Sequence, residues 1–371
     1  ERLAEANRIA EAERLAEAER LAEAESLTQQ DTTGTSNMAN KKLTVGGLFS
    51  GVGGIELAFE RAGFEINWSN EIDKNACKTY RYNHPHHNLI EDDIYQINPK
   101  ELKPVDVLVG GFPCQAFSVA GYRKGFRDPR GNLFFEIVRL IDSLKTKPKA
   151  LMLENVKNLS GHDSGKTKDI IIKTLREFGY SVFWEVYNTS VYTNIPQNRE
   201  RTIIVCFRDE KDWELDLKNK KKYSSYYFDQ NHIKPSKSKK NIQQILEKKE
   251  VDEKFYYRQD FYAYKELRKT IKRKDTVYQW RRVYVRENQS NECPTLTANM
   301  GTGGHNVPLI LDDFGIRKLT PRECFRLQGF KNIKFPKDVA RSQLYKQAGN
   351  SVTVDLIEKI ALKISQSIKK K

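Results

Sequence analysis

Short apolar runs alternate with amphipathic segments between Leu43 and Phe207, and this alternation limits the fold more than any other feature. Strand-like length and residue types occur in LTVGGLF, EINWSN, VDVLVGG, ALMLEN, SVFWEVYN and TIIVCF. Helix-like segments such as IELAFERAGF and NLFFEIVRLIDSL separate most of these runs. Strand–helix–strand order predicts an α/β fold with a mainly parallel sheet, whose functional groups gather at the carboxyl ends of the strands.

The remaining segments differ from this pattern. Residues 1–37 consist mostly of a hexapeptide repeat rich in Ala, Leu, Glu and Arg, which predicts a helix. Its apolar residues recur every sixth position and walk around the helix, so we expect no coiled-coil seam and treat the segment as an appended leader. We expect a first module over 38–209, a second, Lys- and Tyr-rich module over 210–316, and a return to the first module over 317–371.

Charge favours a polyanionic partner. The chain carries a net charge of +15, and because residues 1–37 hold four Arg and nine acidic side chains, the remainder carries +20. The five cysteines lie far apart, which favours a reducing compartment and gives neither a zinc-type spacing nor a disulfide framework. We therefore expect no metal. No long apolar run or secretion leader is present, so we expect a cytoplasmic protein.

A glycine-rich turn follows the first strand. Gly51, Gly53 and Gly54 in FSGVGG stand between a strand and a helix, where glycine lets the backbone turn tightly beside a ligand. Glu71 ends the next strand, a position from which an acid accepts hydrogen bonds from ribose hydroxyls. Together they predict a nucleoside cofactor. A nicotinamide-dependent dehydrogenase has similar features, so the residues that follow must decide.

Reactive side chains follow the later strands. Cys114 in GGFPCQAFSVAG lies just after VDVLVGG, and its polar, glycine-bearing surroundings favour an exposed thiolate over a buried inert thiol. Glu154 and Asn155 close ALMLEN, and Arg199 and Arg201 precede TIIVCF. Taken singly, each of the charged residues could be an ordinary solvated side chain.

Six motifs in a fixed order give the chain a resemblance to a known family. FSGVGG, GGFPCQ, ENV, QNRER, RKLTPRE and QAGNSV make it similar to DNA cytosine-5 methyltransferases of the bacterial restriction-modification type. The resemblance covers about Leu43 to the end, except for roughly 210–290. It implies a Rossmann-like methyltransferase fold over 38–209 and 317–371, and a smaller, mostly β or irregular target-recognition domain over 210–316.

The resemblance also implies catalytic roles. Cys114 would add to carbon 6 of a cytosine swung out of the duplex, so that carbon 5 can take a methyl group. Glu154, kept protonated in a low-dielectric pocket, would act at ring nitrogen 3, and Arg201 would contact the ring oxygen. Arg199 would support the same site, and Asn155 would steady the loop that carries Cys114.

S-adenosyl-L-methionine is the cofactor that the resemblance implies, with S-adenosyl-L-homocysteine as product. Its binding positions match Phe49, Gly51, Gly53, Gly54, Glu71, Ile72, Asp93, Ile94, Pro113, Asn350 and Ser351. Many members of the family have an aromatic residue where this chain has Ile72, so we expect weaker packing on the adenine. An Asn-Ser pair before a helix is also an ordinary N-cap.

Double-stranded DNA is the implied partner, together with a restriction endonuclease that acts on the same site. Expected DNA contacts, including a mobile lid after Cys114, are Gln115, Ser118, Arg123, Lys124, Arg130, Arg281, Arg282, Thr295 and Leu296. We expect a monomer. Two alternatives remain open: an RNA cytosine-5 methyltransferase, against which the long segment after 210 argues, and a catalytically silent DNA-binding homologue.

Overall fold

The computed structural model describes residues 42–112, 133–208, 233–238, 241–281, 284–288, 290–301 and 307–369. The expected helical leader over 1–37 and the segment that carries Cys114 lie outside these ranges. The described residues from Lys42 onward form one compact unit. No helix within the described ranges combines the length and apolarity that a bilayer span requires.

Seven strands of the described chain form one mixed sheet in the order β3-β2-β1-β4-β5-β8-β6. Their bounds are β1 (Thr44–Leu48), β2 (Glu65–Glu71), β3 (Leu89–Glu91), β4 (Val107–Gly111), β5 (Ala150–Val156), β6 (Tyr180–Asn188) and β8 (Glu200–Arg208). The first five run parallel, whereas β8 is antiparallel to both β5 and β6. The predicted α/β fold with a mainly parallel sheet is confirmed.

The reversal at β8 follows from the short link before it. Between β6 and β8 the chain forms α7 (Thr189–Tyr192) and the two-residue strand β7 (Gln197–Asn198). A parallel return needs a crossover of about a dozen or more residues, usually containing a full helix. The short link allows only an antiparallel neighbour, and it brings Arg199 and Arg201 to the same sheet edge as the end of β5.

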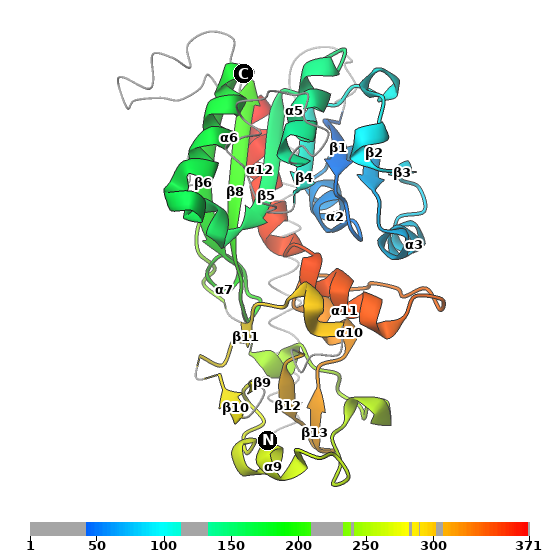
Figure 1. Ribbon diagram of the computed structural model, residues 1–371, viewed down its shortest axis with the longest axis vertical. Helices are drawn as coiled ribbons and strands as arrows, with labels where there is room; N and C mark the ends of the chain where they lie inside the picture. Colours follow the sequence, from blue (N-terminus) through cyan, green and yellow to red (C-terminus); the bar gives the residue numbers. More distant parts are fainter. Residues whose placement is uncertain are drawn as a thin grey trace, which may run out of the picture. The chain divides into compact units, whose positions relative to one another are not determined.

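Helices cover both faces of the sheet (Figure 1). In that view, α5 (Leu133–Ser143) and α6 (Lys166–Glu177) lie in front of the strands, and the red helix α12 (Val354–Lys369) lies behind them. Alternation along β4 shows the same division, because Val107 and Val109 join the cluster that contains α2 (Gly54–Arg61) and α12, while Leu108 joins the cluster of α5 and α6. Burial on both faces explains the nearly continuous apolar character of this strand.

A second, antiparallel sheet has the order β10-β9-β12-β13. Its strands are β9 (Tyr278–Arg281), β10 (Tyr284–Glu287), β12 (Leu309–Leu311) and β13 (Ile316–Lys318), and it packs with α9 (Tyr264–Thr270) around a separate small core. β13 spans the expected boundary at 316/317, and the division into modules stays a prediction. Next to this sheet, β11 (Cys293–Pro294) pairs with β7.

Three helices complete the fold. α3 (Lys74–Asn83) follows β2, and Asp73 caps its amino end by accepting hydrogen bonds from Asn75 and Ala76. α10 (Pro321–Arg326) starts in a capping box in which Thr320 and Glu323 satisfy each other's backbone N–H groups. α11 (Arg341–Asn350) then leads into α12.

Candidate active site

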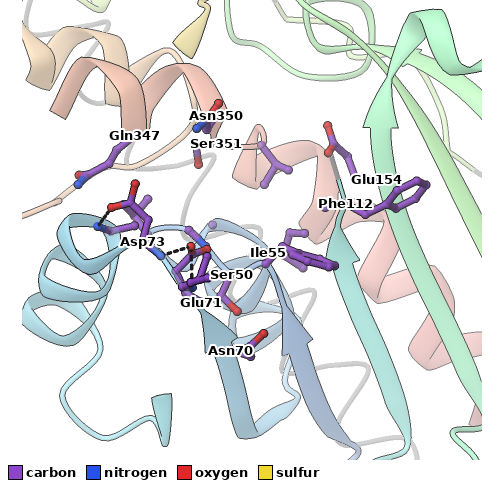
Figure 2. Close-up of a pocket in the computed structure, with 18 of the residues that line it drawn as sticks. Ser50, Ile55, Asn70, Glu71, Asp73, Phe112, Glu154, Gln347, Asn350 and Ser351 are labelled. Atoms are coloured by element: carbon purple, nitrogen blue, oxygen red, sulfur yellow. Dashed lines mark hydrogen bonds between the residues drawn. The ribbon is translucent and has the colours of Figure 1, made fainter. Parts of the chain in front are cut away.

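A cavity of about 550 Å³ lies at the carboxyl ends of β1, β2, β4 and β5 (Figure 2). Its volume is in the range of small-molecule sites, and its place is the one where open α/β sheets bind ligands. Predicted site residues that line it are Phe49, Gly51, Gly54, Glu71, Ile72, Asp93, Ile94, Glu154, Asn155, Arg199, Arg201, Asn350 and Ser351. Residues far apart in the sequence thus share one cavity.

The turn after β1 has the conformation that its glycines predict. Gly51 and Gly53 have φ values of 55° and 87°, and Phe49 adopts a left-handed φ of 54°. A bulky residue in this region is uncommon and is held there by its surroundings, often at a ligand site. Gly53 does not line the cavity, because a Cβ on it would point at the His84 ring, 2.7 Å from Nε2.

Glu71 fixes the backbone at the ends of β1 and β2, on one side of the cavity. Its carboxylate accepts hydrogen bonds from the backbone N–H groups of Gly51 (2.7 Å), Ile72 (3.0 Å) and Asp73 (2.8 Å). The Ile72 side chain beside it is 59% exposed. An exposed apolar side chain on a cavity wall offers a flat ligand a surface for packing.

Asp93 and Ile94 lie at the start of a short 3-10 helix, η1 (Ile94–Gln96). The Asp93 carboxylate accepts a hydrogen bond from the backbone N–H of Tyr95 and thereby caps this helix. Ile94 is buried. These contacts fix the backbone beside the cavity, close to the end of β3.

Glu154 and Arg201 form an ion pair that lines the cavity on the side away from Glu71. Nε of Arg201 lies 2.9 Å from Oε1 of Glu154, and the two side chains are only 14% and 12% exposed. Arg201 stands within β8 rather than before it, and it lies opposite Val156 of β5. Glu154 is two residues before Val156 and so shares its face of the sheet, which lets Arg201 reach Glu154 diagonally. Figure 2 shows Glu154 on a different strand from Glu71, lining the same cavity.

Asn155 holds the chain that leads toward Cys114. Its Nδ2 donates a 2.9 Å hydrogen bond to the backbone oxygen of Phe112, the last described residue before 113–132. Asn155 is 2% exposed, so water does not compete for this bond. The amide therefore fixes the backbone two residues before Cys114.

Arg199 is buried beneath the cavity. Its guanidinium donates hydrogen bonds to the backbone oxygens of Leu296 (2.9 Å), Gly349 (3.0 Å) and Ser351. Burial lowers the pKa of Arg199 well below its ordinary value, and the nearby charge of Arg201 acts in the same direction. Arg199 thus holds together three chain segments that are distant in sequence, the chain before β8, the Thr295–Leu296 pair and the end of α11.

The described cysteines are all buried. Burial raises the pKa of the Cys77 thiol to about 12 and raises the pKa values of Cys206, Cys293 and Cys324 as well. Neutral buried thiols are poor nucleophiles. Predicted site residues outside the described ranges are Cys114, Pro113, Gln115, Ser118, Arg123, Lys124, Arg130 and Arg282.

One face of the β9–β10 pair is polar and exposed. Arg281 lies opposite Tyr284, and Gln279 lies opposite Arg286, so these four side chains share a face. Tyr284 is 56% exposed, and both arginines are exposed. We call these four residues the β9–β10 face.

The predicted Thr-Leu pair is divided between surface and core. The exposed Thr295 donates a hydrogen bond to the backbone oxygen of Asn198 (2.6 Å). The Leu296 side chain is only 1% exposed, and its backbone bonds with Gln197 and Arg199. Of this pair, only Thr295 has an exposed side chain.

Comparison with known proteins agrees with this geometry. The sequence profile of the family described as C-5 cytosine-specific DNA methylase matches residues 43–366. The chain belongs to this family. It is 48% identical over 330 residues to the type II methyltransferase M.Bsp6I of Bacillus sp. (strain RFL6), covering 88% of this chain and 99% of that protein.

Further relatives of the methylase extend this likeness. The type II methyltransferase M.SsoII of Shigella sonnei is 38% identical over 342 residues, which cover 91% of this chain and 84% of that protein. Among solved structures, the S. pombe Dnmt2 methyltransferase matches with a TM-score of 0.64 at 20% identity, covering 88% of this chain and 99% of that one. At that identity the likeness shows the shared fold.

The structure of the methylase adds cavity residues that the sequence did not indicate. Nζ of Lys346 lies 2.6 Å from Asp73, and Oε1 of Gln347 accepts a hydrogen bond from Thr79 (2.9 Å). Nε2 of Gln347 is buried without a partner in the described part of the chain. Gln347 begins the QAGNSV motif, but its contact with α3, like that of Lys346, forms only in the folded chain.

Asn350 and Ser351 do not cap the last helix of the methylase. Asn350 is the final residue of α11, and Ser351 is its C-cap. α12 begins only at Val354. The ordinary N-cap explanation for this Asn-Ser pair is therefore wrong, and both residues line the cavity instead.

Proposed function

We propose that the methylase transfers a methyl group from S-adenosyl-L-methionine to carbon 5 of a cytosine flipped out of a specific short site in duplex DNA. The observation that carries the proposal is the shared cavity, in which Glu71 and the glycine turn stand at one side and Glu154 and Arg201 at the other. A cofactor acid and a pair suited to a pyrimidine ring thus face the same space. Family membership supports the same reaction.

The cavity residues fit the cofactor. Gly51 has open space where a Cβ would stand, which leaves room for a ligand against the turn. Glu71 keeps acceptor capacity for ribose hydroxyls beyond its backbone bonds, and the exposed Ile72 offers packing for an adenine. The buried, unpartnered Nε2 of Gln347 adds a hydrogen-bond donor. When bound, the cofactor supplies an electrophilic methyl group.

The nucleophile in this proposal is Cys114. The other four of the five cysteines are buried thiols with raised pKa values, which favours Cys114 by elimination. The Cys114 thiolate adds to carbon 6 of the ring, and the electron pair displaced from the double bond makes carbon 5 nucleophilic. Asn155 would limit the positions of this thiolate through its bond to Phe112. After methyl transfer, a base removes the carbon 5 proton and the thiolate leaves.

Glu154 and Arg201 would handle the charge of the ring. Attack at carbon 6 pushes electrons toward ring nitrogen 3, where the Glu154 carboxyl group donates a proton, and Arg201 donates a hydrogen bond to the ring oxygen. The two side chains pair with each other in this structure, and an ion-paired carboxylate has no proton to give. Glu154 would therefore take up the proton that it donates only as the incoming base displaces Arg201, and ring nitrogen 3 and the ring oxygen would then give the two side chains new partners.

DNA recognition is assigned to the second module and to the segment after Cys114. The β9–β10 face presents two arginines, a tyrosine and a glutamine, side chains that contact phosphates and base edges. Arg123, Lys124 and Arg130 would contact the backbone as the lid closes over the flipped base. A net charge of +20 outside residues 1–37 supplies the electrostatic part of this binding.

The relatives support a proposal for the biological setting. Both of the relatives compared above are type II methyltransferases. We therefore propose a modification enzyme that acts as a monomer in the cytoplasm beside a restriction endonuclease of the same specificity.

Labelled methyl transfer tests the proposal. Purified protein incubated with methyl-labelled S-adenosyl-L-methionine is expected to label duplex DNA, and bisulfite sequencing should place the label at one cytosine in a fixed context. Cys114→Ala should bind the cofactor but transfer no methyl group. Labelling of transfer RNA in preference to DNA, or activity in Cys114→Ala, would overturn the substrate or the nucleophile respectively.

A covalent trap tests the intermediate separately. In duplex DNA with 5-fluorocytosine at the target position, carbon 5 carries fluorine where the base would remove a proton. With S-adenosyl-L-methionine present, the wild-type protein should therefore remain bonded to the DNA under denaturing conditions, and Cys114→Ser should not. DNA binding without turnover or trapping would instead identify a catalytically silent homologue.

A further inference from the structure

Behind the glycine turn lies a group of side chains that methyl transfer does not use. Glu60 of α2 and His84 and His87, just after α3, place one potential ligand atom each within 4.8 Å of one another. Nε2 of His87 lies 3.5 Å from Oε1 of Glu60. Ligand atoms around one tetrahedral ion at about 2.0–2.2 Å from the metal lie roughly 3.3–3.6 Å apart. His87 and Glu60 thus already stand at the separation that a tetrahedral ion needs, and the remaining ligand atoms, all within 4.8 Å of one another, would have to approach by up to about 1.5 Å.

The two histidines are held together before any ion binds. Their rings stack at 4.9 Å with an interplanar angle of 12°. His84 is only 8% exposed, and the His87 side chain is 9% exposed, whereas the Glu60 side chain is 52% exposed. Because stacked rings hold their nitrogen lone pairs in nearly parallel planes, one imidazole would have to turn before both rings could face a single ion, which the accessible carboxylate could reach from the solvent side.

Hydrogen bonds orient the His87 ring. Its Nδ1 lies 2.9 Å from the Tyr80 hydroxyl, and that hydroxyl lies 2.8 Å from Oγ of Ser69. This leaves Nε2 to face Glu60. Histidines that ligate metals commonly use one ring nitrogen for the ion and the other for such an orienting bond.

We propose that Glu60, His84 and His87 form a binding site for a borderline divalent cation of the Zn²⁺ type. Two imidazoles and a carboxylate are a ligand set that zinc accepts, and water completes the fourth position. The expectation of no metal rested on the cysteine spacing alone. Its ligands come from α2 and from the residues after α3. Only the folded structure brings these segments together, so the sequence did not indicate the site.

The site would support the glycine turn from behind. Gly53 stands so close to His84 that a Cβ there would approach Nε2 to 2.7 Å. An ion held by His84 and His87 would therefore fix the ring on which this turn rests. It would act outside the cavity, without contact to the cofactor or to the cytosine.

Zinc binding to the whole protein tests the proposal. After equilibrium dialysis against Zn²⁺, we expect the wild type to retain one ion more than Glu60→Gln or His87→Ala. His86→Ala is the matched control, since His86 lies beside the ligands but outside the cluster, and it should retain the wild-type number. Glu60→Gln changes an exposed side chain, so loss of zinc in this variant cannot be attributed to misfolding.

Cobalt spectra and histidine NMR identify the ligands. Co²⁺ bound at this site should show ligand-field bands without a thiolate charge-transfer band, and a Cys114→Ser background should leave the bands unchanged. In protein labelled with nitrogen-15 histidine, Zn²⁺ should shift the ring signals of two of the six histidines, those of His84 and His87. Equal zinc retention by wild type and Glu60→Gln, or a thiolate band that Cys114→Ser removes, would overturn the proposal. Because these readouts need neither DNA nor S-adenosyl-L-methionine, failure of the proposed methyl transfer leaves them intact.

Discussion

Arg201 and Glu154 form a partly buried ion pair, with Nε and Oε1 2.9 Å apart, on two neighbouring antiparallel strands. If Glu154 donates the proton to the base and Arg201 stabilises its oxygen, Glu154→Gln should lower kcat about 10²- to 10⁴-fold, the usual share of a general acid. Single-turnover methylation measures this effect. Glu200→Gln, which removes an exposed pair with Lys157 outside the cavity, should stay near wild type. Equal losses in both variants would contradict the assignment.

Arg199 should matter chiefly for stability. Arg199→Met deprives three buried carbonyl groups of their donor, and we expect the free energy of unfolding to fall by about 3–5 kcal/mol. Urea unfolding followed by circular dichroism measures the change. Arg81→Ala, which removes an exposed ion pair with Glu91, is the control and should cost less than about 1 kcal/mol. A wild-type unfolding midpoint in Arg199→Met would show that the three hydrogen bonds carry little energy.

Glu71 should govern cofactor affinity without taking part in chemistry. Glu71→Gln keeps one acceptor oxygen but loses the charge, so each hydrogen bond to a ribose hydroxyl weakens. We expect the Kd for S-adenosyl-L-homocysteine to rise about 10- to 100-fold, equivalent to roughly 1.4–2.8 kcal/mol, as measured by calorimetry. At saturating S-adenosyl-L-methionine, kcat should remain within about twofold of wild type. A kcat loss that excess cofactor does not restore would argue against a binding role.

Glu56 should make stability depend on pH. Burial raises the pKa of this carboxyl group from 4.5 to about 7, although the nearby Ser50 hydroxyl acts in the opposite direction. Between these two values the folded state keeps a proton that the unfolded state releases. The contribution of Glu56 to stability therefore falls as pH rises through this window, by about 3 kcal/mol in total.

Glu56→Gln removes this titration. The free energy of unfolding of the variant, minus that of wild type, should increase by about 3 kcal/mol from pH 4.5 to pH 8. Urea titrations at a series of pH values measure the difference, which cancels groups that titrate alike in both proteins. A constant difference across this range would mean that folding does not raise the pKa of Glu56.

The β9–β10 face should contribute to DNA affinity through charge. Arg281→Ala and Arg286→Ala each remove an exposed guanidinium, and an arginine that binds a phosphate should, when replaced, reduce the slope of log K against log salt by about 1. An arginine that reads a base should instead change sequence preference at one position. Arg268→Ala, in the last turn of α9, is the control. Unchanged affinity, slope and preference in both variants would remove this face from the DNA interface.

Much of the fold could be predicted because the strands are buried on both faces. Such strands read as apolar runs, and residues such as Glu71 and Glu154 stand out where each run ends. Strand direction was harder to predict. The reversal at β8 depends on the short link after Asn188. The alternation of strand-like and helix-like segments does not indicate this change of direction.

The site could be predicted only where function and local sequence coincide. A glycine turn and a strand-end acid are local features, so Gly51 and Glu71 could be identified from the chain alone. Gln347 meets Thr79 only when α11 packs on α3, and Glu56 shows its raised pKa only inside the core. Pairings between distant segments determine these contacts, and a single sequence does not show them.

The three backbone acceptors of Arg199 have a consequence for synthesis on the ribosome. A nascent chain that ends after β8 already contains both sides of the cavity, but Leu296, Gly349 and Ser351 have not yet emerged. The Arg199 guanidinium then lacks all three acceptors and stays hydrated. The buried contacts beneath the cavity therefore cannot form. A truncated translation product would therefore be unable to methylate DNA. Methylation would begin only when the last helices have left the exit tunnel.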